Sequence, residues 1–301
     1  MLYFCCGLAD EIINCTMAMV NKYRNGKFML KISIITVSYN AAATIEQAIS
    51  SVVNQTYENI EYIIIDGGST DGTVDIIRKY EDRIAYWVSE PDEGIYDAMN
   101  KGIDAATGDY VYFLGADDAL LSDEILCLVS DDIRKTNDDI YSYCEYMITD
   151  AGMQKYVSNK FARNQKLIKS MIPHQGMFVK TILAKKNHFD IRYKLTADFK
   201  FFLQCRLNSA VHITYKDLPV AYFSLSGISG KQAKDMENEV RDIYAELCLA
   251  YPENTVLGYR LILKKILKAM GIFYLLIRLK DKRGWHRHKC KNQFCRWCGR
   301  R

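Results

Sequence analysis

The sequence predicts an α/β protein with a doubly wound, mostly parallel sheet. Three observations lead to this prediction. Short apolar runs alternate with helical patterns four times between Lys31 and Asp118. Each run ends in small or acidic residues, as buried parallel strands do at their carboxyl ends. The composition, 49% hydrophobic and 25% charged over 301 residues, is that of a globular protein with a sizeable core.

The expected elements of the first half follow one another regularly. Strands are predicted at 32–37, 61–66, 84–88 and 109–114, and helices at 43–56, 73–80 and 94–107. The first of these helices has apolar residues at positions 45, 48, 49, 52 and 53, which is the spacing of one helical face. This half therefore reads as Rossmann-like, with strands and helices in alternation.

In the second half of the chain, strands and helices alternate less regularly. It is expected to contain helices at 123–135, 196–207 and 232–250, strands at 139–149 and 216–225, and short strands within 155–180. We predict one main domain at 29–230, with a nucleotide-binding half at 29–120 and a second half at 121–230 that would hold further substrate contacts. The glycine- and serine-containing stretch GISGK, residues 227–231, is expected to act as a lid.

Both ends of the chain differ from this domain. Residues 1–28 fit no pattern that follows, so we expect either an extension upstream of a start at Met29 or a short helix packed on the domain. Residues 231–283 are predicted to form C-terminal helices, the last of them basic and amphipathic. Residues 284–301 are predicted to be a disordered tail with His286, His288, Cys290, Cys295 and Cys298, a weak candidate for zinc binding.

Charge is distributed unevenly along the chain. From Gly258 onward there are 14 Lys or Arg residues and one acid, whereas the preceding chain has 26 basic and 35 acidic residues. Such a basic end predicts contact with an anionic membrane surface; the alternative is a helix packed on the body with solvated lysines. No nucleic-acid-binding module is recognised. No run reaches the roughly 18–20 apolar residues of a spanning helix, so we expect that the protein does not cross a membrane. Ten scattered cysteines without a secretory signal of the usual kind predict reduced thiols in a cytoplasmic protein.

Polar residues follow three of the predicted strands. Tyr39 and Asn40 end the first, Asp66 the second, and Asp117 and Asp118 the fourth. Because the carboxyl ends of parallel strands meet at one edge, we expect these side chains to line a nucleotide-sized crevice. Adjacent carboxylates at a buried strand end suit Mg²⁺ or Mn²⁺. A solvated turn into the next helix is the alternative for this pair.

Five ordered motifs carry a family resemblance: VSYN, a helix containing NQT, IDGGSTDGT, SEPDEGIYDAMNKGI and ATGDYVYFLGADD. Together they resemble the inverting family 2 glycosyltransferases of the GT-A fold, in particular those that build bacterial O-antigen and exopolysaccharide. The resemblance is strong over residues 31–120 and looser over 170–230. It implies a nucleotide-diphospho-sugar donor, with a UDP-sugar favoured, and a polyprenyl-linked or saccharide acceptor.

The resemblance also implies roles for individual residues. Tyr39, with Asn40 beside it, would flank the base, and Asp66 would face the base or ribose. Asp118, aided by Asp117, would hold the metal on the diphosphate. Two departures from the usual family pattern are present. Gly67 replaces a carboxylate that often contacts the base, and the motif YDAMNKG lacks an arginine for which Asn100 or Lys101 would substitute. Asp97 is a further candidate donor contact.

An inverting transfer needs one general base for the acceptor hydroxyl. The resemblance favours Asp198, in LTADFKFF; a carboxylate stabilising the first turn of its helix is the alternative. His174 and Gln175, in PHQGMF, are candidates for binding the acceptor or a phosphate.

The predicted function is therefore sugar transfer for a cell-surface polysaccharide. Two rivals are a catalytically silent nucleotide-sugar-binding scaffold and a sugar nucleotidyltransferase. The second would carry a glycine-rich loop where this chain has SYNAAAT. A dehydrogenase is disfavoured because no GxGxxG follows a strand.

Overall fold

The computed structural model describes residues 29–149, 151–159, 174–225, 233–250 and 286–287. Strand β1 lies between β2 and β4 in its curved sheet, and all seven of its residues are buried. The strands are β1 (Ile32–Ser38), β2 (Ile60–Asp66), β3 (Tyr86–Ser89), β4 (Tyr110–Gly115), β5 (Ala119–Leu120), β6 (Ile140–Ile148), β7 (Met153–Val157), β8 (Met177–Lys180), β9 (Ile213–Ser224) and β10 (His286–Arg287). The helices are α2 (Ile45–Val53), α3 (Thr73–Arg78), α4 (Ile95–Ala105), α5 (Ile125–Thr136), α7 (Thr181–Lys186), α8 (Ala197–Leu207) and α9 (Ala233–Ala250), with 3₁₀ turns η1 (Glu81–Arg83) and η2 (His174–Gly176).

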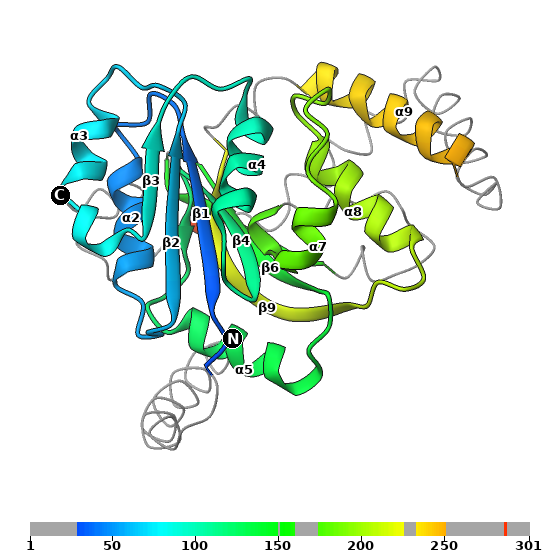
Figure 1. The fold of residues 1–301 in the computed structure, drawn as a ribbon, viewed down its shortest axis with the longest axis horizontal. Coiled ribbons are helices and arrows are strands. Elements are labelled where there is room, and N and C mark those ends of the chain that lie inside the picture. The colour runs from blue at the N-terminus through cyan, green and yellow to red at the C-terminus, as the bar shows by residue number, and fades with distance from the viewer. Residues whose placement is uncertain (1–28, 150, 160–173, 226–232, 251–285, 288–301) are drawn as a thin grey trace.

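The first half of the chain forms a parallel sheet in the order β3-β2-β1-β4 (Figure 1). The register pairs Ser38 with Asp66 and Asp66 with Ser89, so three polar strand ends lie side by side. Gly115, at the end of β4, pairs with Val37 of β1. The predicted parallel sheet of the first half is confirmed, and the carboxyl ends of its strands form one edge.

Alternate residues of the parallel strands supply two cores, one on each face. Ile32 and Ile34 pack with α2, α3 and α5, whereas Ile35 and Val37 pack with α4, α7 and α8. Helix α4 lies so close to β1 that a side chain at Gly102 would collide with Ile35. Helices therefore cover both faces of the sheet, as the sequence predicts.

The second half adds mixed pairing to this sheet. β8 is antiparallel to both β4 and β6, and β9 runs parallel to β6. The far end of β9 pairs with β5, which begins directly after Asp118. This pairing brings the chain near Ser224 to the acidic pair at the end of β4. Neither β5 nor α7 is among the predicted elements, and the two residues of β5 are too short to show a periodicity.

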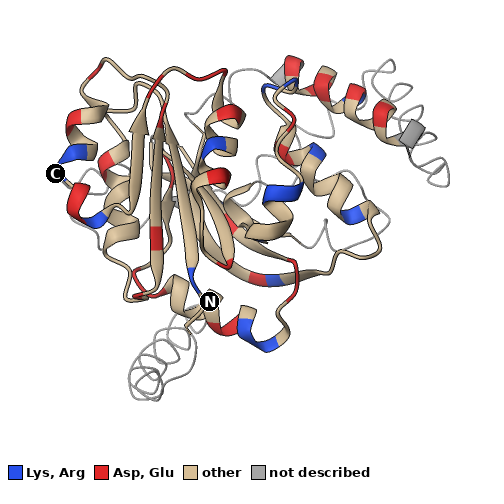
Figure 2. Cartoon of the chain, viewed as in Figure 1, with Lys and Arg blue, Asp and Glu red and all other residues tan. Residues whose placement is uncertain are grey.

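Helix α9 packs directly on α8. Ile243, Tyr244 and Leu247 of α9 meet Phe199 and Leu203 of α8 in a small hydrophobic cluster. Within the predicted C-terminal unit 231–283, this helix is acidic rather than basic, as the colouring of Figure 2 shows. It is thus joined to the second half of the domain rather than set apart from it.

Several predictions fall outside the described residues. These are the extension 1–28, the lid at 227–231, the basic amphipathic helix after Gly258 and most of the Cys/His tail. Of that tail, His286 and Arg287 are described as β10, which pairs antiparallel with β7. In the described ranges, no helix combines the length and apolarity needed to cross a membrane.

Candidate active site

Asp66 organises the carboxyl edge of the parallel strands. It is completely buried, and the register of β1, β2 and β3 places the hydroxyls of Ser38 and Ser89 beside it. These hydroxyls donate hydrogen bonds of 2.8 and 2.7 Å to its two oxygens, and Ser69 adds bonds from its hydroxyl and its N–H. Burial raises the pKa of Asp66, but these hydrogen bonds outweigh it and hold the pKa below the usual value. Asp66 therefore fixes the shape of this edge as an anion.

The loops after β1 and β2 are bound to one another above Asp66. Asn40 has a left-handed backbone (φ 47°), its side-chain oxygen accepts a bond from Thr70 N–H, and its own N–H donates to the Ser69 hydroxyl. Asp71 accepts bonds from Ala42 N–H and from Thr73. Asn40 is thus engaged within the protein. By contrast, the Tyr39 side chain is 67% exposed, which leaves its ring available to a ligand.

Asp117 and Asp118 converge over the end of β4. A Cβ at Gly115 would lie 2.6 Å from Asp118 Oδ2 and 3.1 Å from Asp117 Oδ1, so this glycine leaves room for both carboxylates. Asp118 is 1% exposed. Its Oδ1 accepts a 2.9 Å bond from Ser224 N–H, and its Oδ2 accepts a 2.7 Å bond from the Gln175 amide.

The electrostatics of this pair fit a cation. Burial, followed by the charge of Asp117, raises the pKa of Asp118 to about 7, although the bonds from Ser224 and Gln175 oppose the rise. Two close carboxylates in a buried place are stabilised when a divalent ion neutralises them. In the described residues, no group of three or more His, Cys, Asp or Glu side chains forms a complete metal cage. One or two carboxylates are the usual protein share of a Mg²⁺ site that substrate phosphates complete.

Asp198 begins α8 and is held by three groups. Its Oδ1 accepts 2.8 Å bonds from the Tyr96 hydroxyl and from Phe199 N–H, and its Oδ2 lies 3.0 Å from Nδ1 of His174. Burial, and then the charge of Asp198, raises the pKa of Tyr96, so this hydroxyl keeps its proton and donates. The Asp198 side chain is 2% exposed and that of His174 is 12% exposed, so His174 forms the more accessible end of the pair.

The turn η2 joins the two acidic centres. Its first residue, His174, contacts Asp198, and its second, Gln175, donates to Asp118. The Tyr112 hydroxyl, on β4, donates a 2.8 Å bond to the backbone carbonyl of Gln175 and fixes the turn from below. The predicted residues Asp118, His174, Gln175 and Asp198 therefore belong to one connected site.

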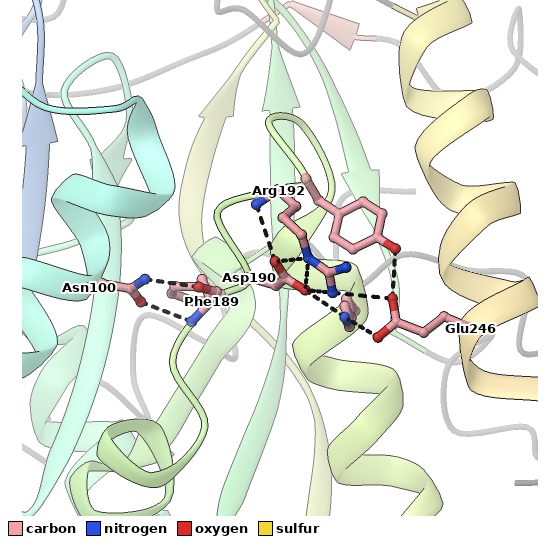
Figure 3. Close-up of polar contacts among 7 residues, drawn as sticks. Asn100, Phe189, Asp190, Arg192 and Glu246 are labelled. Carbon is pink, nitrogen blue, oxygen red and sulfur yellow. Dashed lines mark hydrogen bonds and ion pairs between the residues drawn. The ribbon is translucent and has the colours of Figure 1, made fainter. Parts of the chain in front are cut away.

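Three other predicted donor contacts are engaged by neighbouring protein groups. The Asn100 amide exchanges two 2.9 Å bonds with the backbone of Phe189 (Figure 3). Lys101 lies 2.8 Å from Glu90, and this hydrogen bond raises the pKa of the lysine. Asp97 accepts a bond from Glu93 N–H at the start of α4. In this structure they brace α4 and the loops beside it, and a donor contact by any of them stays a prediction.

Two residues of the site are absent from the sequence-based prediction. Tyr96 lies within the motif GIYDAMNKG, one helical turn before Asn100. A polar hydroxyl on the apolar face of a predicted helix is the sequence feature that points to it. Glu145 on β6 gave no signal. Both of its carboxylate oxygens are buried and have no hydrogen-bond partner within the described ranges. Burial raises the pKa of Glu145 to about 8, and the charges of Asp118 and Asp198 act in the same direction. It is therefore a third buried carboxyl group near both acidic centres.

Comparisons with known proteins agree with this arrangement. The sequence model described as glycosyl transferase family 2 matches residues 33–189, which is more than half of the chain. A PGL/p-HBAD biosynthesis glycosyltransferase of Mycobacterium bovis is 28% identical over 261 residues, covering 85% of this chain and 98% of that protein. An uncharacterized glycosyltransferase of Mycobacterium tuberculosis is 31% identical over 188 residues, covering 58% of this chain and 69% of that protein.

Solved structures show the same fold. Residues 1–349 of S. aureus TarS in complex with UDP-GlcNAc superpose with a TM-score of 0.59 at 21% identity, covering 73% of this chain and 67% of that one. Against the longer TarS chain, the share covered is 40%. A mannosyltransferase from Pyrobaculum calidifontis, in complex with GDP-Man and Mn²⁺, has a TM-score of 0.55 at 15% identity and covers 91% of this chain and 90% of that one. The family match and the shared fold show that the chain belongs to glycosyl transferase family 2, is a transferase and has the GT-A fold.

Proposed function

We propose that this protein is an inverting glycosyltransferase that moves a sugar from a nucleotide-diphospho-sugar to a lipid-linked or saccharide acceptor. One observation carries the proposal: consecutive residues of η2 link the two acidic centres, His174 to Asp198 and Gln175 to Asp118. A donor held at Asp117 and Asp118 would therefore have its transferred sugar close to Asp198. Direct displacement by an acceptor requires this proximity.

Each side chain has a distinct task in this scheme. The Asp198–His174 pair takes up the proton of the acceptor hydroxyl, with Asp198 as the base and the Tyr96 hydroxyl fixing its orientation. Gln175 and Ser224 N–H position Asp118 for the diphosphate. A bound Mg²⁺ or Mn²⁺ would supply charge neutralisation for the departing nucleoside diphosphate, and Asp118 and Asp117 would hold it.

The nature of the substrates is proposed from the relatives. UDP-GlcNAc bound to TarS supports a UDP-sugar donor, and the name of the mycobacterial relatives supports an acceptor in the biosynthesis of a cell-surface molecule. We propose O-antigen, capsule or exopolysaccharide synthesis at the inner face of the cytoplasmic membrane as the setting. The basic residues after Gly258 would contact anionic lipid there.

The test is turnover with a panel of labelled UDP-, GDP- and CDP-sugars, Mn²⁺, and lipid-linked or saccharide acceptors. A transferase yields a glycosylated acceptor whose anomeric configuration is opposite to that of the donor. A silent scaffold binds a donor without transfer or hydrolysis. A nucleotidyltransferase instead releases pyrophosphate from a nucleoside triphosphate and a sugar phosphate. Either of these two results would overturn the proposal.

A further inference from the structure

Gly67 is a glycine for reasons of space rather than backbone conformation. Gly68 and Gly72, in the same loop, have positive φ angles, whereas Gly67 does not. A Cβ at position 67 would lie 2.5 Å from Oδ2 of Asp92 and 3.2 Å from its Cγ. The Asp92 carboxylate therefore occupies the volume that a side chain at position 67 would fill.

The Asp92 carboxylate is held at this place by its own loop. Oδ1 accepts a 2.8 Å hydrogen bond from Gly94 N–H at the start of α4. Pro91, directly before it, restricts the backbone. Among the residues that the structure describes, no hydrogen bond or ion pair engages Oδ2, although the Asp92 charge contributes to the raised pKa of Lys101. A charged acceptor with one oxygen anchored and the other open is ready to bind a donor group.

An exposed aromatic ring lies beside this open oxygen. Tyr39 Cδ2 is 3.4 Å from the same Cβ position at Gly67, and the Tyr39 side chain is 67% exposed. Tyr39 follows the carboxyl end of β1 and Gly67 follows that of β2, and this edge is the place where α/β sheets bind nucleotides. A base stacked on an exposed tyrosine ring would therefore have its edge near Asp92.

We propose that Asp92 recognises the nucleobase of the donor and selects bases that present an imino N–H. This inference rests on the proposed function. A carboxylate accepts hydrogen bonds and donates none, so it pairs with N3–H of uracil or with N1–H and the amino group of guanine. Cytosine and adenine present a ring-nitrogen lone pair at the equivalent position, which a carboxylate repels. Asp92 would thus exclude cytidine and adenosine donors.

The test is calorimetric titration of the full chain with UDP, GDP, CDP and ADP in the presence of Mn²⁺. Wild-type protein is expected to bind UDP or GDP at least about 10-fold more tightly than CDP, and the tighter of the two identifies the base. Asp92→Asn keeps the bond to Gly94 but replaces the anion with an amide. We expect Asp92→Asn to weaken binding of the preferred nucleotide about 10-fold or more, because hydrogen bonds to a charged group are stronger than those to an amide. The difference in affinity between that nucleotide and CDP should become smaller.

Glu93→Gln is the matched control, because it removes an exposed neighbouring charge and should change neither affinity nor ranking. A second variant, Gly67→Asp with Asp92→Ser, moves the carboxylate to position 67 and should retain the preference, whereas Gly67→Asp alone should lose affinity through collision with Asp92. The proposal is overturned if Asp92→Asn binds the four nucleotides as Glu93→Gln does. If Asp92→Asn does not fold, the double variant Gly67→Asp with Asp92→Ser decides, and equal binding of all four nucleotides by it overturns the proposal. If the wild type binds none of the four, the proposed function itself fails.

Discussion

Among single residues, Asp198 shows most clearly how the fold prepares a reactive group. Three hydrogen bonds from α4, η2 and its own helix fix a carboxylate that is almost fully buried. A base held in this way needs little reorganisation when an acceptor arrives. The same bonds explain why the GIYDAMNKG and PHQGMF motifs occur together, since each contributes one partner of Asp198.

Asp198→Asn should lower transfer by at least about 100-fold, because an amide takes up no proton. Binding of the nucleoside diphosphate should be unchanged, since Asp198 lies at the acceptor end of the site. Product formation and calorimetric binding, measured on the same preparation, check both parts. Turnover close to that of the wild type would show that the base lies elsewhere.

Tyr96→Phe should reduce kcat without changing the donor KM, because it removes one orienting bond to Asp198 and nothing else polar. The loss in stability should be about 1 kcal/mol, the usual contribution of one hydrogen bond. Steady-state kinetics and thermal unfolding separate the two effects. An equal fall in kcat with Tyr80→Phe, whose hydroxyl bonds to Glu46 away from the site, would contradict a specific role for Tyr96.

Sequence reasoning at this scale found residue types but not their partners. Asp118, His174, Gln175 and Asp198 were predicted, and the structure joins them in one network. Asn100 and Lys101 were predicted as donor contacts, yet their polar groups meet Phe189 and Glu90. A motif indicates which polar side chain stands at a position. The partner of that side chain depends on tertiary contacts, which the spacing of residues in the sequence does not specify.

Among the elements, α9 does more than extend the chain. The Lys200 side chain of α8 is only 5% exposed, and its ammonium lies 2.7 Å from Asp190 and 2.6 Å from Glu246. One ammonium therefore joins α8, the preceding loop and α9. Glu239 of α9 accepts bonds from Lys194 N–H, Leu195 N–H and the Thr196 hydroxyl. Helix α9 therefore holds the loop that leads into Asp198.

Lys200→Met should destabilise the protein by about 2–4 kcal/mol, because it leaves Asp190 and Glu246 without their buried cation. Activity should fall as well, since the loop before Asp198 loses its anchor. Chemical denaturation and transfer assays measure the two losses. Arg192→Ala is the control: its side chain is 69% exposed, and exposed ion pairs contribute little to stability. Similar losses for both variants would contradict the anchoring role.

The elements that sequence reasoning missed are short ones. The parallel strands are continuous apolar runs and the long helices have a clear periodicity, so the sequence predicts both to within a few residues. β5 has two residues and η2 has three, so neither shows a pattern. Yet these two place Asp118 against Ser224 and against Gln175. The site's second half thus depends on pairings over more than 50 residues of sequence, which local patterns do not predict.

For the whole molecule, the raised pKa values predict an unusual dependence of stability on pH. The pKa is raised to about 7 for Asp118 and to about 8 for Glu145, from unfolded values near 4. Between these limits, the folded state binds more protons than the unfolded state. The metal-free protein should therefore lose stability as the pH rises from about 5 to about 8. Glu61 acts in the opposite direction at acid pH. Burial raises its pKa, but hydrogen bonds outweigh burial and lower the pKa to about 2. Its contribution to stability is therefore lost as the pH falls below about 4.

The measurement is the free energy of unfolding at several pH values, with a chelator and with Mn²⁺. The decline toward pH 8 should be smaller in Asp118→Asn, which has no charge to bury, and smaller in the wild type with Mn²⁺, which neutralises the ionised carboxylate. A flat profile in chelator would show that these carboxyl groups are not buried as described.

The central claim is that the edge formed by Asp66, Asp117 and Asp118 binds a metal-bound nucleoside diphosphate. Calorimetric titration of UDP and GDP tests it most directly, with Mn²⁺ and with chelator, on the wild type, Asp118→Asn and the exposed control Asp123→Asn. The account predicts binding that depends on Mn²⁺, is weakened at least about 10-fold by Asp118→Asn, and is unchanged by Asp123→Asn. Equal binding by the Asp118→Asn variant, or binding that ignores the metal, would contradict it.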